Sequence, residues 1–161
     1  ETLIAYELPV WNRSVRRQLS KHPKFYFVDN GINNAVTKQL RDPPSFQQRG
    51  KWFEQWFINE MRALASYAGS ECNFHFWRTE RGEFEVDLII AKQNVPVAAI
   101  EIKAKKKLVS TDFKGLKEFG AEYPNCKLYC VCEVETPYQV CSITVFPALE
   151  FLSKVALNKI L

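Results

Sequence analysis

Apolar residues recur along the chain with two different periods, and each period predicts a type of element. Between residues 50 and 68 they return every three or four positions, which is typical of a helix with one face on a core. Residues 73–78, 83–91 and 95–103 alternate or become continuously apolar, which predicts three strands. The short polar segments between these strands fit hairpin turns, so we expect a helix followed by an antiparallel meander.

The second half of the chain continues this mixture. Residues 111–122 have a helical pattern that stops before Pro124, and residues 127–133 and 139–146 have the pattern of two more strands. A final amphipathic helix begins at Pro147, because proline suits the first turn of a helix. The core order helix, three strands, helix, strand predicts an α/β fold with a mixed central sheet flanked by helices.

The N-terminal part has weaker patterns. Residues 3–9 and 24–28 fit short strands, and residues 13–21 fit a basic helix. An Asp-Pro-Pro-Ser segment then breaks the chain. We therefore expect residues 1–44 to form an N-terminal extension that packs on the core, and residues 45–161 to form the compact domain.

Composition narrows the class of protein. Of the 161 residues, 47% are hydrophobic and 25% charged, which is ordinary for a globular domain and excludes a disordered tail. The five cysteines are an odd number without a CxxC pair, so we expect reduced thiols in a cytoplasmic protein and no zinc site. Because the chain begins at Glu1 and its only methionine is Met61, we expect a fragment of a longer protein.

The net charge of +4 leaves two interpretations open. Basic residues gather in two clusters, and a solvated surface explains each cluster as well as nucleic-acid binding does. The first cluster comprises Arg13, Arg16, Arg17, Lys21 and Lys24, and the second comprises Lys103, Lys105, Lys106 and Lys107.

Acidic side chains on the predicted strands carry the clearest candidate chemistry. Alternate residues of a strand share a face, so Asp87 lies with Glu85 and Ile89, and Glu101 lies with Lys103. If the hairpin pairs the two strands, Asp87 comes near Glu101. Two adjacent carboxylates repel each other and favour a shared proton or a divalent cation. Their hard oxygens suit Mg²⁺ or Mn²⁺, and a neighbouring lysine orients a water molecule or stabilises charge on a phosphate.

The first predicted helix adds two acidic residues. Helical geometry places Glu54 in line with Ile58 and Met61, and Glu60 close to Phe53. A carboxylate that faces a core is costly unless it is paired. Pairing with an arginine at the rim and binding of a cation both remain open.

Three acidic positions and one lysine resemble a known motif. Glu54, Asp87 and Glu101-x-Lys103, in the order helix, hairpin and strand, resemble the PD-(D/E)XK nuclease superfamily, which has a restriction-endonuclease-like fold. The chain more closely resembles a domain of unknown function that follows AAA+ ATPase modules in archaeal and bacterial ATPases. The matching stretches are HPKFYFVDNGI at 22–32, GKWFEQWFINEMRAL at 50–64, FWRTERGEFEVDLII at 76–90 and AIEIKA at 99–104.

The resemblance implies a restriction-endonuclease-like core with Mg²⁺- or Mn²⁺-dependent phosphodiesterase activity. In that family pattern, Asp87, Glu101 and Glu54 hold the metal, and Lys103 orients the attacking water. These four are the expected catalytic residues. Glu60 matches a second acid on the same helix.

The resemblance also implies partners. Arg78 matches an arginine before the hairpin, and it is expected to contact nucleic acid together with Lys105, Lys106 and Lys107. Implied partners are nucleic acid, with DNA favoured over RNA, and an AAA+ ATPase domain in the same or another chain, but no membrane. The sequence itself has no Walker A glycine loop. Since related nucleases that cut both strands often pair two subunits, a homodimer is one arrangement that the resemblance allows.

Three hypotheses therefore stand side by side. The first is an active metal-dependent nuclease. The second is a catalytically silent module that docks nucleic acid or a protein partner of the ATPase. The third is a purely structural network of buried ion pairs, because such networks also imitate active sites. His75 alternates with apolar residues and is expected to be a core histidine under all three.

Overall fold

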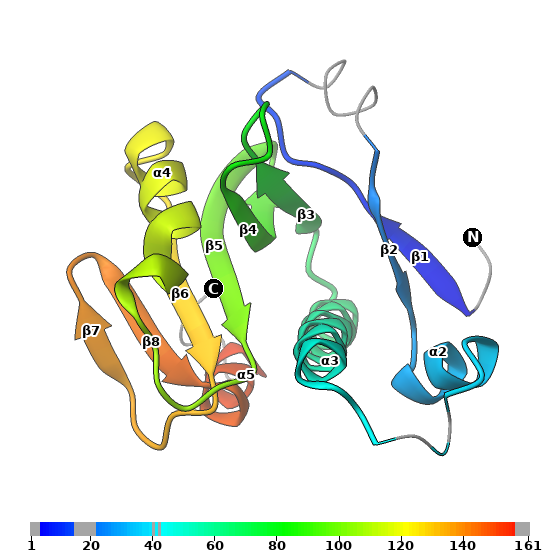
Figure 1. Cartoon of the computed structure of the whole chain (residues 1–161). Helices are drawn as coiled ribbons and strands as arrows, with labels where there is room; N and C mark the ends of the chain where they lie inside the picture. The colour runs from blue at the N-terminus through cyan, green and yellow to red at the C-terminus, as the bar shows by residue number, and fades with distance from the viewer. Residues whose placement is uncertain (1–3, 15–21, 40, 42, 157–161) are drawn as a thin grey trace.

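An N-terminal arm precedes the central sheet (Figure 1). The structure is a computed structural model that describes residues 4–14, 22–39, 41 and 43–156. In the arm, β1 (Ala5–Leu8) pairs antiparallel with β2 (Lys24–Phe27), and α2 (Asn30–Val36) follows. The helix predicted at 13–21 lies, from residue 15 onward, outside the described residues.

The longest helix, α3 (Phe46–Tyr67), begins four residues before the position that the apolar period predicts. Its start is fixed by a capping box, in which the Ser45 hydroxyl accepts a hydrogen bond from the Gln48 N–H and the Gln48 side chain accepts one from the Ser45 N–H. Polar capping extends the helix beyond its apolar stripe. Phe57, Ile58 and Met61 form its buried face.

Six strands form one mixed sheet in the order β3-β4-β5-β6-β8-β7. β3, β4 and β5 form the predicted antiparallel meander, β6 is parallel to β5 and to β8, and β7 closes one edge in the antiparallel sense. The strands are β3 (Asn73–Arg78), β4 (Glu85–Lys92), β5 (Val95–Lys103), β6 (Lys127–Cys132), β7 (Tyr138–Val140) and β8 (Ile143–Pro147).

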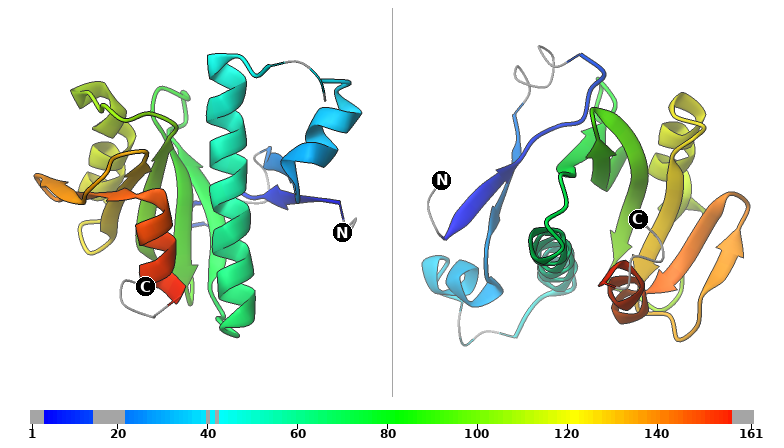
Figure 2. Two further views of the ribbon diagram at one scale, coloured as in Figure 1. Left: turned by 90° about the horizontal axis from the view of Figure 1, so that it is seen from below. Right: turned by 180° about the vertical axis from the view of Figure 1, so that it is seen from behind.

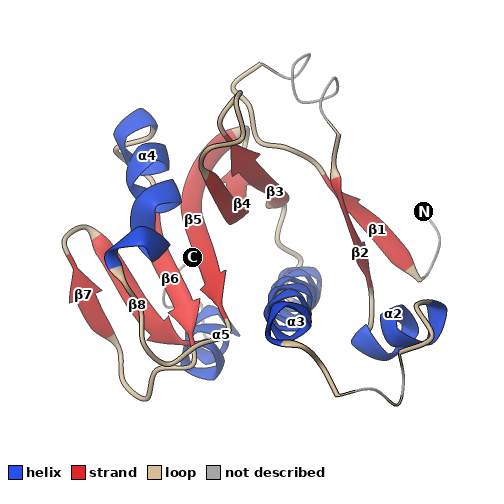
Figure 3. Cartoon of the chain, in the orientation of Figure 1, coloured by secondary structure: helices blue, strands red, loops and turns tan. Residues whose placement is uncertain are grey.

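Helices cover both faces of this sheet (Figures 2 and 3). α3 and α5 (Ala148–Ala156) pack on one face, and α4 (Lys114–Glu122), preceded by the short 3-10 helix η1 (Ser110–Phe113), packs on the other. The order α3, three strands, α4, β6 confirms the predicted mixed α/β fold with an N-terminal extension. None of the described helices is long and apolar enough to span a membrane.

One predicted strand is wrong. Residues 139–146 are divided between β7 and β8, which form a hairpin that turns at Cys141. Cys141 adopts a positive φ of 54°, a conformation that L residues seldom take and that the apolar alternation does not reveal. The hairpin therefore places β7 at the edge of the sheet.

Hydrogen bonds attach the arm to α3 and to β3. The Tyr6 hydroxyl donates to Asn59 of α3 at 2.6 Å, and the Asn59 amide donates to the Val28 carbonyl at 2.9 Å. Further along the arm, the Trp11 N–H donates a hydrogen bond to the Phe76 carbonyl of β3 at 2.5 Å. These bonds hold β2 beside α3 and bring Lys24 toward the sheet.

Candidate active site

The site lies where β4 and β5 separate. Their regular pairing ends at Leu88 opposite Ile100. Just beyond, the carboxylate of Asp87 accepts the Ile102 N–H at 2.9 Å, in place of a strand carbonyl. This bond satisfies a backbone group that the separation leaves free, and it fixes the Asp87 side chain between the strands.

A bulge determines which way Asp87 points. The register of β3 with β4 passes from His75 opposite Ile89 to Trp77 opposite Val86, so two β4 residues stand against one β3 residue. As a result, Ile89 joins the core on the α4 side, whereas Asp87 approaches Lys24 of the arm. The prediction that Asp87 and Ile89 share a face is therefore wrong, because strict alternation assumes an unbroken ladder.

Glu101 and Lys103 of β5 complete the group predicted on the sheet. The Lys103 ammonium donates to Glu101 Oε1, and it lies 3.9 Å from Asp87 Oδ2. The second Glu101 oxygen, Oε2, is buried without a hydrogen-bond partner among the described residues. Asp87 and Glu101 are only 8% and 7% exposed. Two nearly buried carboxylates thus share one lysine.

Lys24 of β2 also belongs to the site, although the sequence pattern predicts it only as a member of the first basic cluster. Its ammonium lies 3.0 Å from Glu54 Oε1, 2.5 Å from Glu85 Oε1 and 3.7 Å from Asp87 Oδ1. It also lies 5.3 Å from the centre of the Phe76 ring. Glu54 therefore pairs with a lysine from the arm and not with an arginine at the rim. Only the HPKFYFVDNGI stretch signalled this position.

Tyr26 supports the same carboxylate. Its hydroxyl donates to Glu54 Oε1 at 2.5 Å, and burial together with the Glu54 charge raises the pKa of Tyr26 far above its ordinary value. The tyrosine remains a neutral donor at any physiological pH. Glu54 is thus held toward the site by two groups of β2.

Electrostatics in the site oppose ionisation of the acids. Burial, followed by the charge of Glu54, raises the pKa of Asp87 to about 6, although Lys103, Lys24 and the Ile102 N–H act in the opposite direction. Burial and then Asp87 raise the pKa of Glu101 well above its ordinary value. The site therefore holds more negative charge than its two lysines offset.

For the two lysines, the same surroundings favour the charged form. Burial by itself lowers the pKa of Lys24 and Lys103, but the surrounding carboxylates outweigh burial and leave both values above the ordinary one. Both ammonium groups consequently stay charged. They are fixed positive charges within a cluster of acids.

The donor set fits a magnesium ion that keeps much of its water. Mg²⁺ is commonly held by one or two carboxylates together with water and substrate phosphate. Asp87 and Glu101 supply such a pair, and the unpartnered Glu101 Oε2 is an available oxygen. Among the described residues, no group of three or more His, Cys, Asp and Glu side chains is arranged to hold a metal by itself. The predicted third ligand, Glu54, is engaged by Lys24 and Tyr26.

A groove opens beside these residues. Its volume is about 390 Å³, and it lies between the first turns of α3 and the end of β5. Its walls include two of the predicted catalytic acids and three lysines. The lining comprises Phe46, Gln47, Gly50, Lys51, Glu54, Asp87, Ile102, Lys103, Ala104 and Lys105.

The predicted nucleic-acid contacts are dispersed. Lys105 lines the groove and pairs with Asp112 at 2.6 Å, whereas Lys106 and Lys107 are exposed in the loop after β5. Arg78 lines a different cavity of about 360 Å³ and stacks on Phe76, with 5.6 Å from its guanidinium to the ring centre. Of the four, only Lys105 lines the groove; Lys106 and Lys107 follow it in the chain, and Arg78 lies at the other cavity.

The predictions for Glu60 and His75 have different outcomes. Glu60 is exposed on α3, so the expectation that it faces the core is wrong. His75 is buried and packs edge-on against Trp11, with ring centres 5.2 Å apart, as expected for a core histidine. Neither residue belongs to the site.

Comparisons with known proteins identify a family. Neither the curated proteins nor the solved structures gave a match. A family model described as a domain of unknown function, DUF4143, matches residues 49–151, which is more than half of the chain and includes the three acids and Lys103. This agrees with the closer of the two resemblances, while the PD-(D/E)XK resemblance stays a prediction. The chain belongs to the family of domains of unknown function DUF4143.

Proposed function

We propose that this protein is a metal-dependent nuclease of the PD-(D/E)XK type, which hydrolyses phosphodiester bonds in nucleic acid. The supporting observation is the convergence of Asp87, Glu101 and Lys103 where β4 and β5 separate, beside a groove lined with lysines. Asp87 lines this groove, and a buried acid with a raised pKa beside a groove is typical of a functional site.

Each residue has a role in this proposal. Asp87 and Glu101 hold Mg²⁺ or Mn²⁺, and the buried Glu101 Oε2 is the oxygen with no competing partner. When bound, the metal activates a water molecule and stabilises the leaving oxygen of the phosphodiester. Lys103, whose ammonium bonds Glu101, orients that water and counters charge on the phosphate. Glu54, held by Tyr26 and Lys24, contributes through water.

The partners follow from the same resemblance. We propose nucleic acid, with DNA before RNA, as substrate, and an AAA+ ATPase domain in the same or another chain as the associated machine. Lys105, Lys106 and Lys107 follow the end of β5, and in this proposal they contact phosphates next to the site.

One observation favours a second function. Lys24 and Lys103 already supply positive charge to Glu54, Glu85, Asp87 and Glu101. An acid cluster with its own lysine counter-ions fits a catalytically silent module that docks nucleic acid or an ATPase partner. The Glu101 Oε2 atom, which has no hydrogen-bond partner among the described residues, supports the nuclease over this second function, because buried oxygens in a self-sufficient ion network are usually satisfied.

A cleavage assay tests the proposal. Labelled single-stranded and duplex DNA are incubated with the protein in Mg²⁺ or Mn²⁺, and wild type is compared with Asp87→Asn and Glu101→Gln. Glu60→Gln is the matched control, because Glu60 is an exposed acid on α3. Cleavage by wild type and by the control, but by neither site variant, is expected. Equal cleavage by Asp87→Asn rejects the nuclease, and binding without cleavage in wild type selects the docking module.

A further inference from the structure

The wall of the groove opposite β5 carries an exposed aromatic ring. Phe46 is the first residue of α3, it lines the groove, and 77% of its surface is exposed. The capping box of Ser45 and Gln48 fixes the backbone on which it stands. A phenylalanine this exposed contributes little to folding, but it offers a flat apolar face beside the candidate active site.

Gly50, one helical turn after Phe46, has no side chain that could cover the Phe46 ring. Gly50 follows Phe46 at the i+4 position, so the two lie on the same side of the helix. Gly50 also lines the groove, and apart from its chain neighbours and the adjacent helix backbone a Cβ added there would meet no atom within 4 Å. Space beside the ring is therefore open. Glu54 is the next member of this row, about 12 Å from Phe46 along the helix axis.

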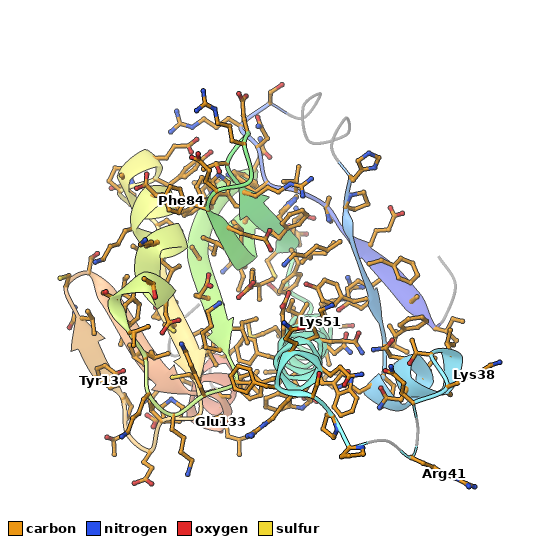
Figure 4. All side chains as sticks on the ribbon, viewed as in Figure 1. Lys38, Arg41, Lys51, Phe84, Glu133 and Tyr138 are labelled. Carbon is orange, nitrogen blue, oxygen red and sulfur yellow. The ribbon has the colours of Figure 1, made fainter. Side chains whose placement is uncertain are left out.

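Positive charge lies along the same groove. Lys51 and Lys105 are in its lining together with Lys103 of the site. Lys51, labelled in Figure 4, projects from α3 and makes no ion pair within the described part of the chain. Lys106 and Lys107 follow Lys105 in the chain, and both are exposed. A chain of phosphates would find cations on both walls of the groove.

We infer that the groove binds single-stranded nucleic acid with one base stacked on Phe46, a specificity that rests on the proposed function. Aromatic platforms beside basic grooves bind single strands because each unpaired base exposes a π-face. In a duplex, both faces of a base are already stacked on its neighbours. The Phe46 ring thus favours a single strand or an unpaired end over a continuous duplex.

The test is binding in EDTA, where no metal supports cleavage. Fluorescence anisotropy measures the affinity of the full chain for a labelled oligothymidylate and for a DNA duplex. Phe46→Ala is expected to weaken binding of the single strand by about 5- to 150-fold, the range for loss of one stacked base, and to change duplex binding little. Phe46→Trp retains the single-strand affinity.

Two further variants make the test specific. Tyr67→Ala is the matched control, because Tyr67 is 87% exposed at the other end of the same helix, about 30 Å away; it is expected to bind like wild type. Gly50→Leu fills the space beside the ring without harming the helix and is expected to weaken single-strand binding. Thermal melting verifies that all variants are folded.

The outcomes separate this inference from the proposed function. Wild-type affinity of both Phe46→Ala and Gly50→Leu for the single strand overturns it, and so does an equal loss of duplex binding. In the first case a protein partner on Phe46 becomes the better interpretation, and in the second case Phe46 contacts nucleic acid without a preference for single strands. Failure of the nuclease proposal shows instead as cleavage that Asp87→Asn leaves unchanged, which this binding measurement does not involve.

Discussion

Replacing Asp87 by Asn removes the ionisable group at the centre of the site while keeping its shape. The amide oxygen still accepts the Ile102 N–H, so the backbone contact persists. In the wild type, burial and Glu54 raise the pKa of Asp87 from 3.8 to about 6. Since the folded state holds this proton more tightly than the unfolded state, stability falls as the pH rises between these two values.

The size of the effect follows from the two pKa values. A difference of about 2 pKa units corresponds to about 3 kcal/mol. At pH 4 Asp87 is protonated in the folded protein and a little less than half protonated in the unfolded protein, so Asp87→Asn is expected to change the free energy of unfolding by only about 0.5 kcal/mol. At pH 8 the variant is expected to be more stable than wild type by up to about 3 kcal/mol, which raises the melting temperature by roughly 6 to 12 °C.

The assay is thermal melting of wild type and Asp87→Asn from pH 4 to pH 8 in EDTA. An active site that holds repelling acids predicts a variant that is more stable and, with metal present, inactive. A structural ion network predicts the reverse, because removal of one charge leaves Lys24 and Lys103 undercompensated. Equal or lower stability of Asp87→Asn at pH 8 would refute the reasoning.

Two more substitutions test the surroundings of the site. Lys24→Met removes the ammonium shared by Glu54, Glu85 and Asp87 and is expected to destabilise the metal-free protein by about 3 kcal/mol, measured by urea unfolding. The half-exposed pair of Lys154 with Glu150 supplies the control Lys154→Met, which is expected to change stability by no more than about 0.5 kcal/mol. A loss no larger than that of the control would show that Lys24 is a surface group. Gly115→Ala is expected to cost about 3 kcal/mol despite its better helix propensity, because its Cβ would lie 1.9 Å from the Glu85 carbonyl oxygen where α4 meets β4. Wild-type stability by the same unfolding measurement would contradict that close approach.

The sequence predicts the regular elements of the core well. Alternation places β3, β4 and β5 within two residues of their observed ends, since each strand faces a helix layer and must be apolar there. Local patterns fail where geometry changes over one or two residues. The positive φ of Cys141 divides a predicted strand, and the bulge opposite Phe76 changes the face of Ile89 relative to Asp87.

The candidate site likewise contains residues that the sequence predicts and one that it does not. Asp87, Glu101 and Lys103 come from two adjacent strands, so hairpin pairing alone predicts that they meet. Lys24 reaches them from an arm whose placement depends on the tertiary bonds of Tyr6 and Asn59. No period in the sequence encodes such a contact, because it joins segments 60 or more residues apart.

The most direct test of the central claim is calorimetric titration of the protein with Mn²⁺, which measures whether Asp87 and Glu101 form a cation site. The wild type is expected to bind one ion, and binding is expected to be lost in both Asp87→Asn and Glu101→Gln but kept in Glu60→Gln. Binding that is equal in wild type and Asp87→Asn, or its absence in the wild type, would contradict the metal site at the point where β4 and β5 separate.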